Sequence, residues 1–502
     1  MPKLYLEAIE HARVYDVACE TPLELAPKLS ARLHNEVLFK REDLQSVFSF
    51  KLRGAYNKIA QLSADERKRG VICASAGNHA QGVALSARRL GISAIIVMPR
   101  TTPEIKARAV EAMGAKVVLA GDSYSEASNH AWQMRGETDM VFVHPYDDPL
   151  VIAGQGTIAE EMLRQAPKDM DAVFVPIGGG GLAAGIAVYL KHYSPHTRII
   201  GIEPEDSPAM HDSLKAGSRI TLDQVGIFAD GVAVKQVGEH TFDLVQQYVD
   251  DIVLVDTDEI CAAIKDIFDE NRTIVEPAGA LGLAGMKRYV QQNDVHGQVL
   301  ACINSGANIN FDRLRYVAER AEMGEQKEAL LAVTIPEEPG SFLTFCRLLG
   351  DRNITEFNYR LSSRDEAHVF VGIGIEGEET SQDIQTQLEA HAYPVINLHD
   401  NELAKLHIRH MVGGRSHLVE NEVLYRFEFP ERPGALLEFL MKAAGRWNIS
   451  LFHYRNHGAA FGRVLAGLEV PPDERSAFEA YLNDLGYSYT DESDNSAFKL
   501  FL

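Results

Sequence analysis

Four consecutive glycines, Gly178 to Gly181, constrain the fold of this chain more than any other feature. They directly follow the apolar run 172–176 and directly precede an apolar stretch with helical spacing, residues 182–193. Because glycines leave the backbone N–H groups uncovered, such a row at the start of a helix points several donors toward an anion, and the helix dipole adds partial positive charge. The sequence therefore predicts a strand, a phosphate-binding loop and a helix in succession.

Apolar runs with strand character alternate with helical segments from about residue 70 to residue 305. The runs are 70–74, 94–98, 115–119, 140–143, 172–176, 198–202 and 299–303. Because these runs are apolar throughout, they predict a mostly parallel sheet that is covered by helices on both faces. Ligands of such sheets bind beyond the carboxyl ends of the strands, which is where the glycine loop and the turn 75–79 are expected.

The last third of the chain contains an internal repeat. Residues 336–345 recur as 430–439 and residues 353–360 recur as 448–455, in the same order and at nearly the same offset. Each copy is predicted to fold as a ferredoxin-like βαββαβ unit with a Pro-Gly turn after its first strand. The predicted division of the chain is a catalytic domain 1–320, a polar linker 321–328, and two small domains, 329–401 and 423–495.

Composition excludes several classes of function. The 502 residues are too many for one core, and the net charge of −22 argues against a nucleic acid or an anionic membrane as partner. Five cysteines without CxxC spacing predict neither a disulfide framework nor a zinc site, and no metal site is predicted. The chain has no signal-like start and no window of roughly 18 apolar residues, so we expect a soluble, cytoplasmic protein.

Lys51 lies in the short apolar and basic run 49–54, far from the glycines in sequence. A lysine amine forms a Schiff base with an aldehyde, and an aldehyde that also carries a phosphate would suit the glycine loop. Pyridoxal 5'-phosphate has both groups, so Lys51 and the loop together suggest this cofactor. Most lysines are simply solvated charges, and the hypothesis therefore depends on the other motifs of the chain.

The glycine loop also supports a competing interpretation. Gly178, Gly180 and Ala183 satisfy a G-x-G-x-x-A pattern after a strand, and Glu203 stands at the end of the next strand. That arrangement is typical of dinucleotide-binding folds, in which an acidic residue binds the ribose. A dinucleotide-dependent oxidoreductase would give Lys51 and the C-terminal repeat no role, so we favour the phosphate of pyridoxal phosphate as the ligand of the loop.

Four motifs, in this order along the chain, give it a family resemblance. They are the run around Lys51, Ser75-Ala-Gly-Asn-His-Ala-Gln-Gly82, the loop from Gly178 to Leu182, and Ser305-Gly-Ala-Asn308. Residues 20–320 thereby resemble the fold-type II pyridoxal phosphate enzymes, most closely the biosynthetic threonine dehydratases. The C-terminal copies resemble the paired ACT-like regulatory domains of these enzymes. The implied fold class is an α/β catalytic domain with mostly parallel sheets and flanking helices, plus two α+β ferredoxin-like regulatory domains.

The resemblance also implies roles for individual residues. Lys51 is the catalytic residue, which binds the cofactor and takes the proton from the substrate Cα. Desolvation and a neighbouring cation, Arg53, would lower the pKa of its amine. The remaining cofactor contacts are assigned to Asn78, Gly178, Gly179, Gly180, Gly181, Leu182 and Ser305.

Ser305 indicates the type of reaction, because the resemblance places it against the pyridine nitrogen of the cofactor. A hydroxyl in place of a carboxylate leaves that nitrogen largely neutral, which favours β-elimination over transamination. A serine in a Ser-Gly turn also has an ordinary structural explanation. Ser75 and Gly77 stand in a turn that begins a helix and are assigned to the substrate carboxylate.

The implied reaction eliminates water from L-threonine and then hydrolyses the resulting aminocrotonate to 2-oxobutanoate and ammonia, the first committed step of isoleucine biosynthesis. The regulatory domains are implied to bind isoleucine as inhibitor and valine as its opponent, and a homotetramer is expected. The candidate effector residues are Gly340, Asn353, Tyr359, Gly434, Asn448 and Tyr454. The alternatives are another fold-type II enzyme that acts on serine or threonine (serine dehydratase or racemase type), an amino-acid sensor without catalytic activity, and a C-terminal repeat that serves only oligomer contacts.

Overall fold

The structure is a computed structural model, and two compact units divide it after Gly324: unit 1, Met1–Gly324, and unit 2, Glu325–Leu502. It describes residues 2–498 apart from 326, 339, 351, 376–378, 412, 415, 431–436, 438, 439, 442–446, 456–460, 496 and 497. Each unit has its own hydrophobic cores.

Unit 1 contains two sheets rather than the single sheet that the alternation predicted. The larger has the order β1 (Leu23–Leu25), β2 (Glu36–Lys40), β10 (Val299–Ile303), β7 (Ala172–Pro176), β8 (Arg198–Pro204), β9 (Asp251–Val255), parallel except at β1. The smaller is fully parallel, in the order β5 (Lys116–Leu119), β4 (Ala94–Met98), β3 (Val71–Ala74), β6 (Val141–Phe142). The mostly parallel character that the apolar runs predicted is present in both sheets.

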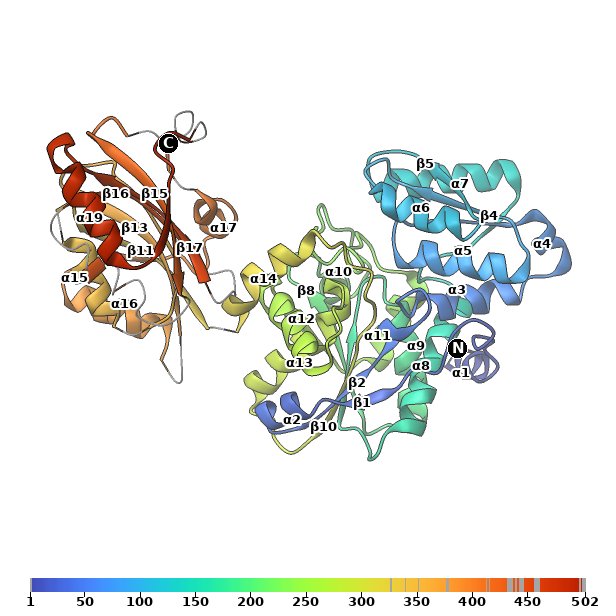
Figure 1. Ribbon diagram of the computed structural model, residues 1–502. Helices are drawn as coiled ribbons and strands as arrows, with labels where there is room; N and C mark the ends of the chain where they lie inside the picture. Colours follow the sequence, from blue (N-terminus) through green and yellow to red (C-terminus); the bar gives the residue numbers. More distant parts are fainter. Residues whose placement is uncertain are drawn as a thin grey trace. The chain divides into compact units, whose positions relative to one another are not determined.

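Helices cover the two sheets of unit 1, and Figure 1 shows α5, α6 and α7 around the smaller one. Those of the smaller sheet and the junction are α3 (Lys51–Ala60), α4 (Ala64–Arg69), α5 (Asn78–Leu90), α6 (Glu104–Ala112) and α7 (Tyr124–Thr138). The others are α1 (Pro2–Glu10), α2 (Pro27–Leu33), α8 (Pro149–Gln165), α9 (Gly181–Tyr193), α10 (Ala209–Ala216), α11 (Glu239–Tyr248), α12 (Thr257–Asn271), α13 (Pro277–Asn293) and α14 (Arg313–Gly324). Because α3 packs against both α5 and α8, its first residue lies where the two sheets meet.

Local sequence explains where several of these helices begin. Capping boxes start α4 at Ser63, α7 at Ser123 and α12 at Asp256, each with a glutamate three residues later. Asp148 accepts hydrogen bonds from the first N–H groups of α8, which has Pro149 at its first position. These signals place helix starts independently of any packing.

Unit 2 forms one eight-stranded antiparallel sheet in its described residues, in the order β14-β11-β13-β12-β16-β17-β15-β18. The first copy comprises β11 (Glu328–Pro336), α15 (Ser341–Leu349), β12 (Ile354–Arg360), β13 (Glu366–Gly374), α16 (Ser381–Ala390) and β14 (Val395–Asn397). The second comprises β15 (Glu422–Pro430), β16 (Asn448–Arg455), β17 (Phe461–Glu469), α19 (Arg475–Leu485) and β18 (Ser488–Asp491). The first copy has the predicted βαββαβ order; the helix predicted after Gly434 lies outside the described residues.

The two copies join through β12 and β16, which pair antiparallel. Asn358 pairs with His453, and on either side Phe357 pairs with Tyr454 and Tyr359 with Phe452. Since the repeat makes Tyr359 equivalent to Tyr454, this register is symmetric about the Asn358–His453 pair. The copies therefore associate as two subunits of a dimer would, within one chain.

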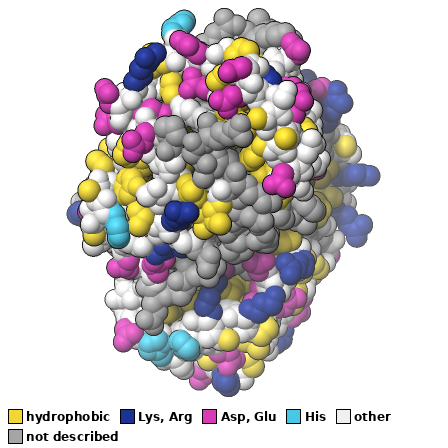
Figure 2. All heavy atoms as spheres, turned by 60° about the vertical axis from the view of Figure 1, so that its left-hand side comes forward, with side chains coloured by type: hydrophobic (Ala, Val, Ile, Leu, Met, Phe, Trp, Pro, Cys, Tyr) yellow, Lys and Arg dark blue, Asp and Glu magenta, His cyan; other side chains and the backbone are white. Residues whose placement is uncertain are grey.

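Figure 1 shows α15, α16 and α19 on one face of this sheet and the connector helix α17 (Glu402–Leu406) on the other. Figure 2 shows acidic and basic side chains interspersed over one face of the molecule. Within the residues that the structure describes, no helix combines the length and apolarity needed to cross a bilayer. The predicted linker 321–328 begins inside α14 and ends at the start of β11, so part of it is helical; the finer domain boundaries stay predictions.

Candidate functional site

A cavity of about 240 Å³ opens in unit 1 beside the start of α3. Five of the predicted site residues line it, from segments far apart in the sequence of unit 1: Lys51, Ser75, Gly77, Asn78 and Gly179. They come from the N-termini of α3 and α5 and from the loop after β7. The structure thus brings together the two motifs from which the cofactor was inferred.

Lys51 is the first residue of α3, and its amine points into this cavity. Its Nζ donates a hydrogen bond to the carbonyl of Pro145 at 3.0 Å and lies 5.3 Å from the centre of the Phe50 ring. Burial lowers the pKa of Lys51 to about 8, against the opposing charge of Glu276. A sizeable fraction of the amine is therefore uncharged near neutral pH, as a nucleophile and proton acceptor requires.

Arg53 does not assist Lys51 as the sequence suggested, and that prediction is wrong. Its guanidinium is fully buried and forms ion pairs with Glu42 at 2.7 Å and Glu161 at 2.6 Å. Lys40 joins the same cluster through Glu161 at 2.6 Å. Because two carboxylates neutralise Arg53, the pKa of Lys51 falls through burial and not through this cation.

The glycine loop needs glycine for steric reasons. A Cβ on Gly179 would lie 2.2 Å from the ring of Tyr146, and one on Gly178 would lie 2.8 Å from the Cα of Val232. Gly180 has a φ of 93°, in the left-handed region that favours glycine. Gly181 is the first residue of α9 and Leu182 packs its side chain into the core, so these two would offer only backbone N–H groups to a ligand.

Glu203, the acid of the competing dinucleotide interpretation, has a structural function. Its two oxygens accept hydrogen bonds from the N–H groups of Met210 at 2.9 Å and His211 at 2.7 Å. They thereby cap the start of α10, and the side chain is fully buried. The acid is thus not available to bind a ribose, and that interpretation loses its key residue.

Asn78 is held at both ends of its amide. Its Nδ2 donates to Oε1 of Glu276 at 2.5 Å, and its Oδ1 accepts from Nδ2 of Asn308 at 2.6 Å. Glu276 and Asn308 also line the cavity, and the sequence assigned neither of them to the site. Asn308 could have been assigned to the site, because it is the last residue of the motif that begins at Ser305. A single glutamate before Pro277 has no such signal, because it indicates only the start of a helix.

Ser305 follows β10 and is buried next to the Lys51 segment. Its Oγ donates to the carbonyl of Ala278 at 3.2 Å, and its own carbonyl accepts from the N–H of Phe50 at 3.2 Å. The adjacent Gly306 forms a bridge with Ser49. Ser305 is therefore close in the fold to the Lys51 segment, while its role toward the ring nitrogen stays a prediction.

These residues fit pyridoxal phosphate. The cavity offers an amine of lowered pKa, an amide N–H and a loop whose N–H groups are uncovered by side chains. A Cβ on Gly77 would meet no atom within 4 Å, so packing within the chain does not explain the bare backbone there. Among the described residues, no group of three or more His, Cys, Asp or Glu side chains could hold a metal ion.

In unit 2, two of the predicted effector residues meet at a half-buried glutamate, Glu337, that the sequence did not single out. The hydroxyl of Tyr359 donates to Glu337, and Nδ2 of Asn448 lies 3.5 Å from the other oxygen of that carboxylate. Burial raises the pKa of Glu337, and Asn448 also donates to Glu469 at 2.9 Å. The two copies thus contribute to one cluster.

Three of the other predicted effector residues have described surroundings of their own. Gly340 has a φ of 95° and begins α15, and the carbonyl of Asn353 accepts from the N–H of Gly374 at 2.7 Å. Tyr454 is buried in β16. Gly434 lies outside the described residues.

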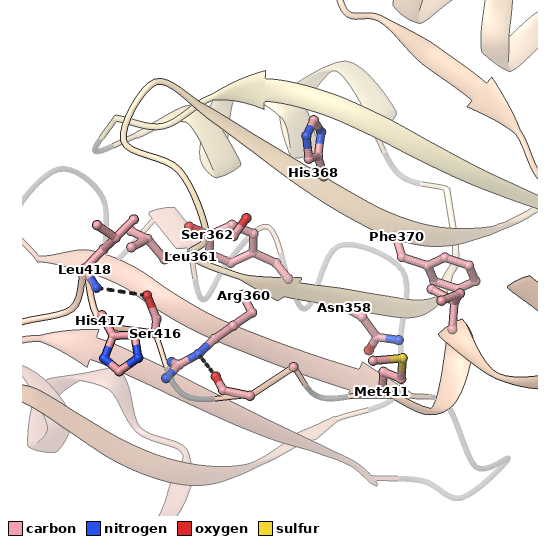
Figure 3. Close-up of a pocket in the computed structure, with 14 residues that line it drawn as sticks. Asn358, Arg360, Leu361, Ser362, His368, Phe370, Met411, Ser416, His417 and Leu418 are labelled. Atoms are coloured by element: carbon pink, nitrogen blue, oxygen red, sulfur yellow. Dashed lines mark hydrogen bonds between the residues drawn. The ribbon is translucent and has the colours of Figure 1, made fainter. Parts of the chain in front are cut away.

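A second cavity, of about 660 Å³, lies on the other face of the unit 2 sheet, between β12, β13 and residues 408–418 (Figure 3). Arg360 and His417 stand toward one end, and Phe370 and Met411 toward the other. Nε of Arg360 donates to the carbonyl of Gly414 at 2.9 Å, and its guanidinium pairs with Glu422. No sequence motif indicates this cavity, because it forms where the connector between the two copies lies against the sheet.

Comparison with known families matches both units. Residues 14–306 match the family described as pyridoxal-phosphate dependent enzyme. Residues 319–408 and 413–502 each match the C-terminal regulatory domain of threonine dehydratase. The predicted cofactor class and the predicted fold class are thereby confirmed.

Individual relatives and solved structures agree with the family matches. The chain is 58% identical to the biosynthetic L-threonine dehydratase of Burkholderia multivorans, over 99% of both chains. It is 53% identical to that of Escherichia coli, over 99% of this chain and 97% of that protein. The processed threonine deaminase isoform 2 of Solanum lycopersicum has a TM-score of 0.63 at 51% identity, over 64% of this chain and 93% of that one. Maize serine racemase has a TM-score of 0.59 at 33% identity, over 62% and 96%.

Proposed function

This chain belongs to the family of biosynthetic threonine dehydratases, and from that premise we propose that it converts L-threonine to 2-oxobutanoate and ammonia, with pyridoxal phosphate bound at Lys51. The observation that carries the proposal is the buried Lys51 amine, of lowered pKa, in one cavity with the glycine loop and Asn78. The proposal uses the family's reaction and assigns it to residues of this chain.

Each residue of the cavity has a different role in this reaction. Pyridoxal phosphate, when bound, accepts the electrons that remain on the substrate Cα after its proton has left. Lys51 Nζ, whose pKa of about 8 leaves roughly half of the amine uncharged at pH 8, accepts that proton, and the carbonyl of Pro145 fixes the direction in which the amine points. The loop around Gly179 binds the phosphate through its N–H groups, and Asn78 Nδ2 donates to the ring hydroxyl. The turn of Ser75 and Gly77 receives the substrate carboxylate.

Ammonia release measured with L-threonine and with L-serine tests the proposal. Lys51→Ala should leave a folded protein and lower kcat by about 10³-fold or more, because a proton acceptor and the cofactor anchor are lost together. Lys58→Ala is the matched control on the same helix, since Lys58 pairs with Asp148 at 2.8 Å and does not line the cavity. Full turnover by Lys51→Ala would refute the assignment. Turnover of serine alone would favour the serine dehydratase type, which differs by one methyl group worth about 1–3 kcal/mol.

We further propose that isoleucine binds unit 2 and inhibits unit 1, and that valine opposes it. Coupling of this kind requires that each ligand bind two global states with different affinities. Gly340, Tyr359 and Asn448 are proposed effector contacts, and the meeting of Tyr359 and Asn448 at Glu337 supports the latter two. Their equivalents Asn353, Gly434 and Tyr454, the cytoplasmic location and the homotetramer stay predictions.

Removal of residues 325–502 tests the division of labour between the units. The shortened chain should retain ammonia release from threonine and lose inhibition by isoleucine entirely, because the effector sites are assigned to unit 2. The full-length chain, assayed in parallel, is the control. Inhibition that persists in the shortened chain would place the effector site in unit 1.

A further inference from the structure

Glu276 is a buried carboxyl group for which neither the family's reaction nor the sequence motifs provide a function. It precedes Pro277 at the start of α13, is 5% exposed, and lines the cavity that contains Lys51. Its side chain makes no hydrogen bond to the start of its own helix, unlike Asp148 or Asp256 at theirs. Its position is therefore not explained by helix capping.

The hydrogen bonds of Asn78 suggest what Glu276 does. An amide has one oxygen and two N–H groups, and the side chain can rotate so that either end faces a ligand. Asn308 occupies the oxygen of Asn78 at 2.6 Å, and Glu276 accepts one N–H at 2.5 Å. While Glu276 is ionised, only one orientation of the amide satisfies both neighbours, because a carboxylate cannot donate and the Asn308 N–H cannot accept. The second N–H of Asn78 remains for a ligand in the cavity.

Gly306 makes room for this contact. A Cβ at that position would lie 2.5 Å from Oε1 of Glu276 and 3.3 Å from Nδ2 of Asn78. The strand end that carries Ser305 therefore approaches the Glu276–Asn78 pair so closely that any side chain would displace it. Residues 78, 276 and 306 come from three separate segments, which pack closely around the hydrogen bond between Asn78 and Glu276.

The surroundings of Glu276 place the pKa of its carboxyl group close to neutral pH, where both protonation states are populated. Burial and the nearby Asp230 raise its pKa to about 7, against Lys106 and the hydrogen bonds from Asn78 and Asn308. Lys51 faces it across the cavity, and the other titratable groups that line the cavity are His79, Tyr124 and Tyr146. Burial lowers the pKa of His79 to about 3 and raises that of Tyr146 to about 12, so neither changes charge near pH 7.

We infer that Glu276 is a positioning residue that fixes the amide of Asn78 with an N–H toward the ring hydroxyl of pyridoxal phosphate, and that its ionisation is transmitted through Asn78 to the bound cofactor. The inference rests on the proposed function, since it takes the cofactor and its Lys51 anchor as given. It adds a carboxyl group to the site that acts through another residue.

Two properties of the full-length protein test this inference: its dissociation constant for pyridoxal phosphate, and the absorbance of the bound cofactor between pH 6 and 8. Glu276→Ala removes the acceptor and frees the amide, so binding should weaken about tenfold, as expected for one hydrogen bond to a charged group. Glu276→Gln keeps an acceptor but cannot ionise, so binding should stay within about threefold while the pH dependence of the absorbance disappears.

Glu203→Gln is the matched control, because Glu203 is also buried and also accepts only N–H groups, at the start of α10. It should show the pH dependence of the unaltered protein. The inference is overturned if Glu276→Ala matches Glu203→Gln in both properties, or if the absorbance of the unaltered protein is constant between pH 6 and 8. If Glu276→Ala does not fold, Glu276→Gln decides: a retained pH dependence overturns the inference, and its loss supports it.

This test separates the inference from the proposed function. If borohydride does not fix the cofactor to Lys51 in the unaltered protein, the proposed function itself fails. If the cofactor is fixed there and the Glu276 variants behave as the control does, only the role of Glu276 is refuted.

Discussion

Two basic side chains stand two residues apart at the start of α3, the fully buried Arg53 and the half-buried Lys51, and they have opposite surroundings. Arg53 is enclosed by the carboxylates of Glu42 and Glu161, at 2.7 and 2.6 Å. Within the part of the chain that the structure describes, Lys51 has only the carbonyl of Pro145 within hydrogen-bond distance, and its pKa is lowered to about 8. A fully paired charge stabilises its position and is chemically inert, whereas an unpaired amine costs stability and is reactive. The same helix thus carries a structural cation, Arg53, and a reactive amine, Lys51.

The largest effect on stability is expected from removing the structural cation, Arg53. Arg53→Ala should lower the free energy of unfolding of unit 1 by about 3–5 kcal/mol, because two carboxylates would remain buried without their cation. The chain has two tryptophans, one in each unit, so a Trp447→Phe background leaves Trp132 to report the urea unfolding of unit 1. Arg69→Ala, which breaks an exposed pair with Asp139, should cost less than about 1 kcal/mol. Equal effects of the two substitutions would contradict the comparison.

A smaller effect of opposite sign is expected from removing the reactive amine. Lys51→Met should raise the free energy of unfolding of the cofactor-free protein by about 2–3 kcal/mol at pH 7, because a poorly solvated charge is removed. The folded pKa of about 8 lies below the unfolded value near 10.5, so the penalty is present below pH 8 and disappears as the pH rises toward 10.5. Urea unfolding at pH 7 and 10 measures the difference, and a stability gap that stays constant over this range would show that the charge is not its cause.

The smallest effect on stability is expected in the loop that faces the amine. Gly179→Ala places a methyl group against the ring of Tyr146 and should cost about 1 kcal/mol, since Tyr146 can shift. Pyridoxal phosphate binding, followed by absorbance, should nevertheless weaken about tenfold or more, because the loop would lose its shape. Gly136→Ala is the control, on the exposed side of α7, where a Cβ meets no atom within 4 Å. Unchanged binding by Gly179→Ala would remove the loop from the phosphate site.

Sequence reasoning found the parts that local pattern encodes. The apolar runs predicted parallel strands, and the repeated 353–360 and 448–455 segments became β12 and β16. It did not find that the strands of unit 1 form two sheets, because which strands pair depends on contacts between distant residues. Nor did the repeat reveal that β12 would pair with β16, since equivalence in sequence leaves the edges of each copy undetermined.

The candidate site shows the same limit. Lys51, Asn78 and Gly179 belong to motifs whose residue types indicate a function, and the structure places all three around one cavity. Glu276 has no such signal, because its importance comes from a hydrogen bond to a residue 198 positions away. Arg53 was misjudged for the related reason that its partners, at positions 42 and 161, are brought to it only by folding.

The central claim is that the Lys51 amine is the one to which the cofactor binds. Reduction of the protein with borohydride in the presence of pyridoxal phosphate, followed by peptide mapping, tests it directly. The account predicts a single pyridoxyl group on the peptide that contains Lys51, and none in Lys51→Ala. A group attached to any other lysine, or no attachment at all, would contradict it.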